Sequence, residues 1–182
     1  MNASLSPDAA ADGGASSAPV IVVGVSPHVP NAVLEQAVVF AAHFAAILVF
    51  VYVDAGRYVV AVGADGVELT EPIDPDLGDD EAQGFPAELR VRLEKSCADA
   101  GLPWRTAVSA GDPADALDRA AQALDAVAIV VGTHRASMRS TVAEFFTGSV
   151  AVHLAHRQAR PVIVVPVVVA ASNDALPWVT EG

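Results

Sequence analysis

Several short segments of the chain are continuously apolar, and stretches of mixed polarity separate them. A strand covered by helices on both faces of a parallel sheet has this pattern, because neither of its faces meets water. The pattern predicts buried strands over residues 20–25, 47–53, 126–131 and 162–165. A further strand is predicted over residues 104–109.

Between these strands, apolar residues recur at helical spacing, which predicts helices. Asn31 is expected to be the N-cap of a helix that ends near Ala46. The apolar stripe of this helix consists of Val33, Leu34, Ala37, Val38, Ala41 and Ala45. Pro86 is expected to begin a second helix that reaches about Ala100.

The third helix has a clear start, because Asp112 has the residue type of an N-cap and Pro113 suits the first helical position. This helix is predicted to end near Leu124, and a last helix is predicted over residues 146–158. Strand and helix therefore alternate along the chain. The alternation predicts an α/β fold, Rossmann-like, with a parallel sheet, right-handed crossovers and helices on both faces.

The predicted domain occupies residues 19–169. Residues 1–18 have almost no apolar bulk and are expected to form a disordered tail, and residues 170–182 a C-terminal tail. An insertion is predicted over residues 55–85. It is expected to contain a β-hairpin of residues 58–62 and 67–70, followed by an acidic loop.

Composition limits the class of protein. A chain of 182 residues fits one domain, and its hydrophobic residues, 53% of the total, include no run long enough to span a bilayer. We see no signal peptide, and the single cysteine, Cys97, allows no internal disulfide, so a cytoplasmic location is predicted. The net charge of −12 argues against nucleic-acid binding.

The charge is distributed unevenly along the chain. Residues 71–84 contain six acidic residues and no lysine or arginine. Residues 134–160 contain a single acidic residue, Glu144, and four arginines: Arg135, Arg139, Arg157 and Arg160. Arg157 and Arg160 have an alternative interpretation, because they can simply complement the C-terminus of a helix.

The basic stretch coincides with a candidate phosphate site. Gly132 follows a buried strand, and Gly148 and Ser149 stand at the predicted entrance of the last helix. A glycine allows a sharp turn and close approach of a phosphate, and a helix N-terminus offers free N–H groups. Spacing alone leaves open the alternative that these glycines serve packing.

The last part of the domain resembles the universal stress protein family, and the resemblance extends over about residues 19–166. The residues that carry it are Val130-Val131-Gly132-Thr133, Gly148-Ser149-Val150-Ala151 and Arg160-Pro161-Val162-Ile163-Val164-Val165-Pro166. The resemblance implies a five-stranded parallel sheet of order 3-2-1-4-5 and a homodimer. One branch of the family binds ATP through a loop of pattern Gly-x2-Gly-x9-Gly-Ser/Thr.

The chain matches this loop in part. Gly132 matches the first glycine, and Gly148 with Ser149 matches the last pair. Arg135 stands at the second glycine, and twelve residues rather than nine separate it from Gly148. The ATP-binding branch also has an aspartate just after the first strand, where this chain has Val25-Ser26-Pro27.

The resemblance therefore implies a site for ATP or another adenine nucleotide. Its candidate residues are Ser26, Tyr52, Gly132, Thr133, Arg135, Arg139, Gly148, Ser149 and Val150. The implied function is a non-enzymatic stress-response module. One alternative is a nucleotide-free module that dimerises through the last strand, residues 162–169, or binds an unknown protein partner. Another is an enzyme of related fold that hydrolyses ATP or transfers a nucleotidyl group.

No motif in the sequence indicates catalysis or a metal. No P-loop, Gly-x-Ser-x-Gly elbow or dinucleotide-binding glycine fingerprint occurs. His153 and His156 lie three residues apart on a predicted helix, but no carboxylate or third histidine is suitably spaced. We therefore predict no catalytic residue and no metal requirement.

Overall fold

The computed structural model describes residues 18–63, 68–74, 84–133 and 150–166. The predicted tails, the acidic loop at 75–83 and the loop at 134–149 lie outside them.

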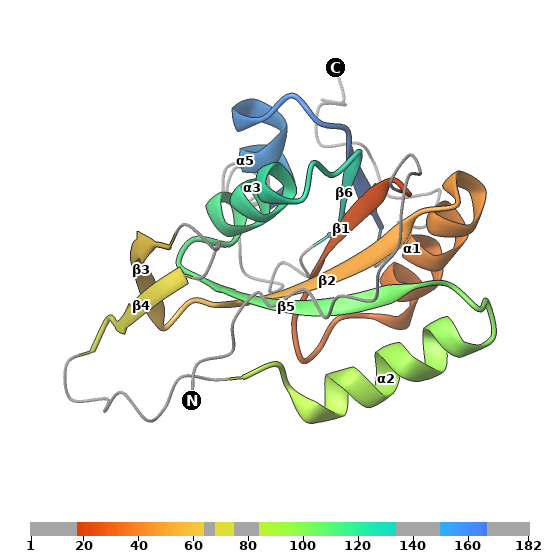
Figure 1. The fold of residues 1–182 in the computed structure, drawn as a ribbon, viewed down its shortest axis with the longest axis horizontal. Helices are drawn as coiled ribbons and strands as arrows, with labels where there is room; N and C mark the ends of the chain where they lie inside the picture. Colours follow the sequence, from red (N-terminus) through yellow and green to blue (C-terminus); the bar gives the residue numbers. More distant parts are fainter. Residues whose placement is uncertain (1–17, 64–67, 75–83, 134–149, 167–182) are drawn as a thin grey trace, which may run out of the picture.

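The centre of the molecule is a parallel sheet of five strands (Figure 1). These strands are β1 (Val20–Val25), β2 (Ile47–Asp54), β5 (Trp104–Ala110), β6 (Ala128–Gly132) and β7 (Val162–Val165). Their order is β5-β2-β1-β6-β7, and every neighbouring pair is parallel. The expected fold class and the order 3-2-1-4-5 are thus confirmed.

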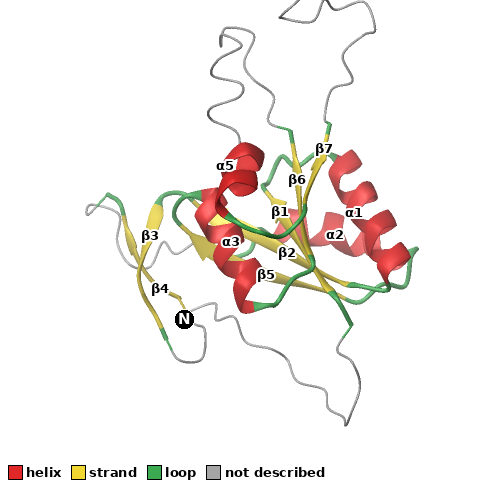
Figure 2. Cartoon of the chain, turned by 90° about the horizontal axis from the view of Figure 1, so that it is seen from above, coloured by secondary structure: helices red, strands yellow, loops and turns green. Residues whose placement is uncertain are grey.

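Helices cover both faces of the sheet (Figure 2). One layer consists of α1 (Asn31–Phe44) and α2 (Ala87–Ala98), and the other consists of α3 (Pro113–Ala123) and α5 (Val150–Arg157). Successive strand residues face opposite layers. In β1, Ile21 and Val23 are buried in the α1/α2 core, whereas Val22 is buried in the α3/α5 core.

The start of α1 differs from the sequence prediction. Pro30 occupies the N-cap position, and no side chain caps the helix. Asn31 is the first helical residue, and its Oδ1 accepts a hydrogen bond from Arg92 Nη2 at 2.8 Å. The helix ends at Phe44, earlier than expected, because Ala45 adopts a left-handed conformation with φ +48°.

The start of α3 agrees with its prediction. Asp112 Oδ1 accepts hydrogen bonds from the N–H groups of Ala114 and Asp115, at 2.9 and 3.1 Å. Beyond α3, Asp125 has φ +46°, and Ala126 donates its N–H to the Ala121 carbonyl. This helix-ending turn delays β6, which begins at Ala128 rather than at the expected residue 126.

The insertion contains the expected hairpin. Its strands β3 (Arg57–Val62) and β4 (Glu68–Pro72) are antiparallel, with an irregularity between Val59 and Ala61. Figure 1 shows the hairpin beside the end of β5, at the edge of the sheet. The hairpin therefore extends the molecule on the side opposite β7.

Candidate functional site

The order of the strands reverses at β1, and this reversal defines the candidate site. Chain direction leads from β1 outward to β2 and β5 on one side, and to β6 and β7 on the other. Ligands in open α/β sheets bind at such a point, beyond the carboxyl ends of the strands. Tyr52 pairs with Val25, so Ser26 follows β1 next to the end of β2. Gly132 ends the neighbouring strand β6 on the other side.

The turn that carries Ser26 is held by an arginine from α2. The turn closes by a hydrogen bond from the Val29 N–H to the Ser26 carbonyl, 3.0 Å long. Arg92 donates from Nη1 to the Pro27 carbonyl at 3.2 Å and from Nη2 to the Val29 carbonyl at 2.5 Å. Ser26 itself is exposed. The guanidinium thus fixes the backbone of this turn while leaving the serine accessible.

Tyr52 lies on the α1/α2 side of the sheet, partly buried against that core. Its ring meets Phe85 edge-on, with centroids 6.4 Å apart, and Arg90 Cζ lies 5.5 Å from the Phe85 ring centroid. Burial, and secondarily the charge of Asp54, raise the pKa of the Tyr52 hydroxyl above its usual value. The hydroxyl therefore stays protonated at neutral pH and keeps its capacity as a hydrogen-bond donor.

Gly132 and Thr133 leave β6 toward the predicted phosphate loop. Gly132 pairs with Val165, and the Thr133 N–H donates to the Val165 carbonyl at 2.9 Å. This N–H therefore continues the ladder between β6 and β7 and is engaged within the protein. Val150 is the first described residue of the helix α5 that follows the loop.

Four of the predicted site residues, Arg135, Arg139, Gly148 and Ser149, lie outside the described residues. The structure brings Ser26, Tyr52 and Gly132 to the same end of the sheet, at the carboxyl ends of β1, β2 and β6. The assignment of all nine residues to a nucleotide site stays a prediction.

The two other arginines of the basic stretch contact the protein itself. Arg157 forms an ion pair with Asp115 of α3 through Nη1 and Oδ1. Arg160 Nε donates to the Ala126 carbonyl at 2.8 Å, and its Nη2 lies 3.7 Å from Asp125 Oδ1. Both arginines therefore attach the end of α5 and the turn after it to α3 and to the turn that follows α3.

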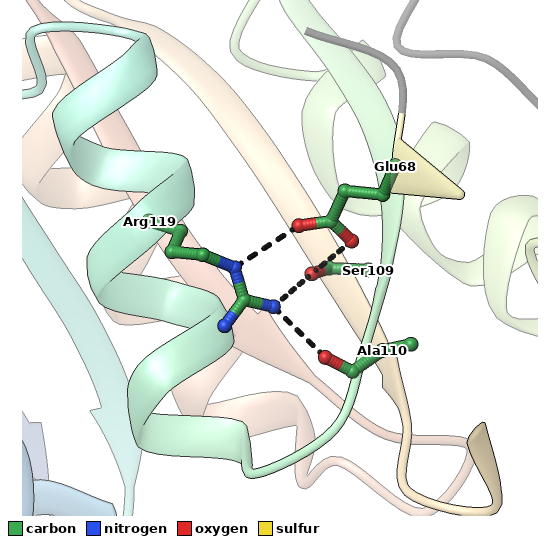
Figure 3. Close-up of polar contacts among 4 residues, drawn as sticks. All are labelled: Glu68, Ser109, Ala110 and Arg119. Atoms are coloured by element: carbon green, nitrogen blue, oxygen red, sulfur yellow. Dashed lines mark hydrogen bonds and ion pairs between the residues drawn. The ribbon is translucent and has the colours of Figure 1, made fainter. Parts of the chain in front are cut away.

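A second polar cluster lies where the hairpin meets α3 and β5, and Figure 3 shows its residues. Arg119 Nε lies 3.2 Å from Glu68 Oε1, and Ser109 Oγ donates to Glu68 Oε2 at 2.7 Å. Arg119 Nη2 also contacts Ser109 Oγ and the Ala110 carbonyl, at 3.3 and 2.9 Å. Sequence analysis missed this cluster, because 51 residues separate Glu68 from Arg119 and no motif joins them.

The described part of the chain contains neither a candidate metal site nor a candidate membrane-spanning helix. Its histidine, cysteine and acidic side chains form no group of three that could hold a metal ion. No helix within it has the length and apolarity needed to cross a membrane.

The fold and the reversal of strand order define a class of α/β proteins. In this class, ligands bind beyond the carboxyl ends of the strands at the point of reversal. Within this class, the model of the universal stress protein family matches residues 19–166, and the chain therefore belongs to this family. The resemblance noted in the sequence is thus confirmed. No curated protein matches the chain.

Solved structures with the same fold include several universal stress proteins. Universal stress protein UspA from Lactobacillus plantarum has a TM-score of 0.58 and 22% identity, and the match covers 83% of this chain and 99% of that chain. A universal stress protein solved in complex with cAMP has a TM-score of 0.51 and 22% identity, with coverage of 83% and 98%. The Archaeoglobus fulgidus universal stress protein in complex with dAMP has a TM-score of 0.50 and 21% identity, with coverage of 81% and 97%.

Proposed function

We propose that this chain is a non-enzymatic stress-response module of the cytoplasm that binds an adenine nucleotide beyond the carboxyl ends of β1, β2 and β6. The observation that carries the proposal is the reversal of strand order at β1, which brings Ser26, Tyr52 and Gly132 to one edge. Structures of two proteins with this fold contain cAMP and dAMP.

In the proposed complex, adenine lies near Ser26 and Tyr52. The phosphates lie over Gly132 and Thr133 and take N–H donors from Gly148, Ser149 and Val150 at the start of α5. Arg135 or Arg139 supplies the positive charge opposite the phosphates. A guanidinium group suits this role because it can donate two parallel hydrogen bonds to phosphate oxygens. The bound nucleotide changes the surface that residues 133–147 present to a partner protein.

Thermal shift and calorimetric titration with ATP, ADP and cyclic AMP test this proposal. A nucleotide at a hundred times its Kd is expected to stabilise the protein by about 2.7 kcal/mol. Gly148→Val is expected to abolish this response, because a branched side chain blocks close approach of a phosphate. Gly84→Val is the matched control, since a Cβ at Gly84 meets no atom within 4 Å.

Two results would contradict this site. One is the absence of any nucleotide response in the unaltered protein at millimolar concentration. The other is a response that survives in Gly148→Val. The non-enzymatic part of the proposal predicts no ATP turnover in the purified protein. Turnover that persists through purification and disappears in Gly148→Val would reverse it.

A second candidate function is a nucleotide-free homodimeric interaction module. Two observations favour it: Ser26 stands where the ATP-binding branch has a carboxylate, and the Thr133 N–H is engaged by Val165. β7 would form the dimer contact. It is an end strand of the sheet, and Val164 on it is 43% exposed.

Light scattering after gel filtration tests the dimer. Val164→Lys is expected to convert a dimer into a monomer, because a lysine on an edge strand opposes pairing with a second strand. Val91→Lys on α2 is the control, since Val91 is 64% exposed and lies away from β7. A dimer that persists in Val164→Lys would place the contact elsewhere.

A further inference from the structure

A hollow of about 280 Å³ lies between the sheet, α3 and the hairpin, on the α3/α5 side of the sheet. Val51 of β2 and Ala107 of β5 contribute from the sheet, Ala120 and Ala123 contribute from α3, and Val62 contributes from the hairpin. Tyr52 packs on the opposite side of the sheet, against the α1/α2 core. None of the lining residues is a candidate residue of the proposed nucleotide site, so the two sites are distinct.

Small side chains create this space. α3 presents alanines to the hollow at positions 120 and 123, and β5 presents Ala107. The core of the same layer contains larger residues, such as Leu117 and Leu154, where α3 and α5 cover the sheet fully. Toward β5 the helix layer ends and the hairpin takes its place. The exposed surface of the hollow is consequently almost entirely apolar.

The polar cluster of Figure 3 forms one part of the lining. The Glu68 side chain is only 11% exposed, and both of its oxygens have partners, Arg119 Nε and Ser109 Oγ. Arg119 uses Nε and Nη2 in the cluster, whereas its Nη1 contacts no acceptor within the described ranges. The guanidinium is thus held in place and retains donor capacity for a further acceptor.

The charges around the hollow select the ligand. Among the described residues of its lining, only Arg119 and Glu68 are charged, and they offset each other. An ionised ligand would lose its hydration without meeting an unmatched opposite charge, which is costly. A neutral ligand incurs no such cost. A volume of about 280 Å³ is just below the range for drug-sized molecules, about 300–1,000 Å³, so the ligand is small.

We infer that this hollow is a second binding site, for a small neutral molecule with an apolar body and one hydrogen-bond acceptor, which takes a hydrogen bond from Arg119. Such a ligand contacts the sheet, α3 and the hairpin at once. It therefore stabilises the attachment of the hairpin to the domain.

Three probes that share a benzyl or phenyl ring and differ in charge test the inference: benzyl alcohol, benzoate and benzylammonium. Amide chemical shifts are followed by NMR in the full chain during titration. Benzyl alcohol is expected to shift the amides of Ala107, Ser109 and Ala120 saturably, with a Kd of about 1 mM for so small a ligand. Each charged probe is expected to bind at least about tenfold more weakly, since it must be desolvated.

A substitution that fills the hollow tests whether benzyl alcohol binds there. Ala123→Leu, at the last residue of α3, is expected to weaken benzyl alcohol binding by about tenfold or more, because the leucine occupies the space. Ala98→Leu, at the last residue of α2, is the matched control and is expected to leave binding unchanged. Benzyl alcohol is expected to slow amide exchange in β3 and β4 in the unaltered protein and in Ala98→Leu, but not in Ala123→Leu.

Several outcomes would overturn the inference. No saturable shift of the lining amides means that the hollow is a packing void. Equal binding in Ala123→Leu places the probe elsewhere. Tighter binding of benzoate or benzylammonium refutes the neutral ligand. None of these results depends on nucleotide binding, so they are separate from any failure of the proposed function.

Discussion

At the scale of single residues, Gly24 shows how closely α3 packs on the sheet. A Cβ built at Gly24 would lie 2.8 Å from Leu117 Cδ1 and 3.4 Å from Val131 Cγ1. Leu117 is buried and belongs to the α3/α5 core, so its side chain has little room to move. The absence of a side chain at Gly24, the last but one residue of β1, is therefore what allows this approach.

Gly24→Ala is expected to destabilise the protein by about 1–3 kcal/mol through overpacking. The measurement is the denaturant midpoint, with Gly84→Ala as the control in open space. In a Leu117→Ala background the same substitution is expected to cost much less, because the clashing methyl group is gone. Equal costs in both backgrounds would show that the contact with Leu117 is not the cause.

Cys97 is a second informative residue. It is 1% exposed on the inner face of α2, and burial raises the pKa of its thiol to about 11. The thiol is therefore protonated in the folded protein at pH 8. A thiol reagent is expected to label it about 10³-fold or more slowly than in the denatured chain, because reaction requires opening of the core.

The same shift has a pH dependence with a definite sign. The unfolded thiol ionises near pKa 9.0, whereas the folded thiol ionises near 11. The contribution of Cys97 to stability is thus full below pH 9 and is lost as pH rises toward 11. Comparison of the protein with Cys97→Ala over this range isolates the contribution from that of other groups. A parallel pH dependence in both proteins would contradict the assignment.

At the scale of elements, Arg92 links α2 to the turn between β1 and α1. Its guanidinium donates to the Pro27 and Val29 carbonyls and to Asn31 Oδ1, and 61 to 65 residues separate it from these partners. One side chain thus connects an element after the insertion with the turn that carries Ser26.

Arg92→Ala is expected to lower stability by about 1 kcal/mol, since three hydrogen bonds to a partly exposed turn are lost. Amide exchange is expected to accelerate at His28 and Val29, with the β1 amides unchanged. Arg92→Lys should recover only part of the effect, because an ammonium group lacks the guanidinium fork. Arg90→Ala, which affects Phe85 and Thr106 instead, is the control on the same helix. Faster exchange at Val29 in the control variant as well would refute the specific role of Arg92.

At the scale of the whole molecule, buried strands and their order were the most predictable features. β1 and β7 begin and end as predicted, because runs of β-branched residues favour strands. The predicted burial is confirmed for β1 but wrong for β7, which is an end strand with Val164 43% exposed. Strand order places Ser26, Tyr52 and Gly132 at the same end of the sheet, and the nucleotide site that the resemblance implies for them stays a prediction.

The failures of prediction concern interactions between distant residues. Asn31 was expected to cap α1, but Pro30 takes that position and Asn31 binds Arg92. The Glu68–Arg119 pair and the engagement of Thr133 by Val165 depend on tertiary contacts that no local pattern encodes. The strands and their order could therefore be predicted from the sequence. The side-chain contacts around the candidate site could be identified only in the structure.

The sheet divides the apolar interior into two separate compartments. Leu34 and Phe50 belong to one, and Leu117 and Ile129 belong to the other. Because Leu34 and Leu117 belong to different clusters on opposite faces of the sheet, the losses of stability caused by truncating each are expected to add. Substitutions on the hairpin side of the sheet can therefore alter its surface and packing while the packing on the other side stays as it is.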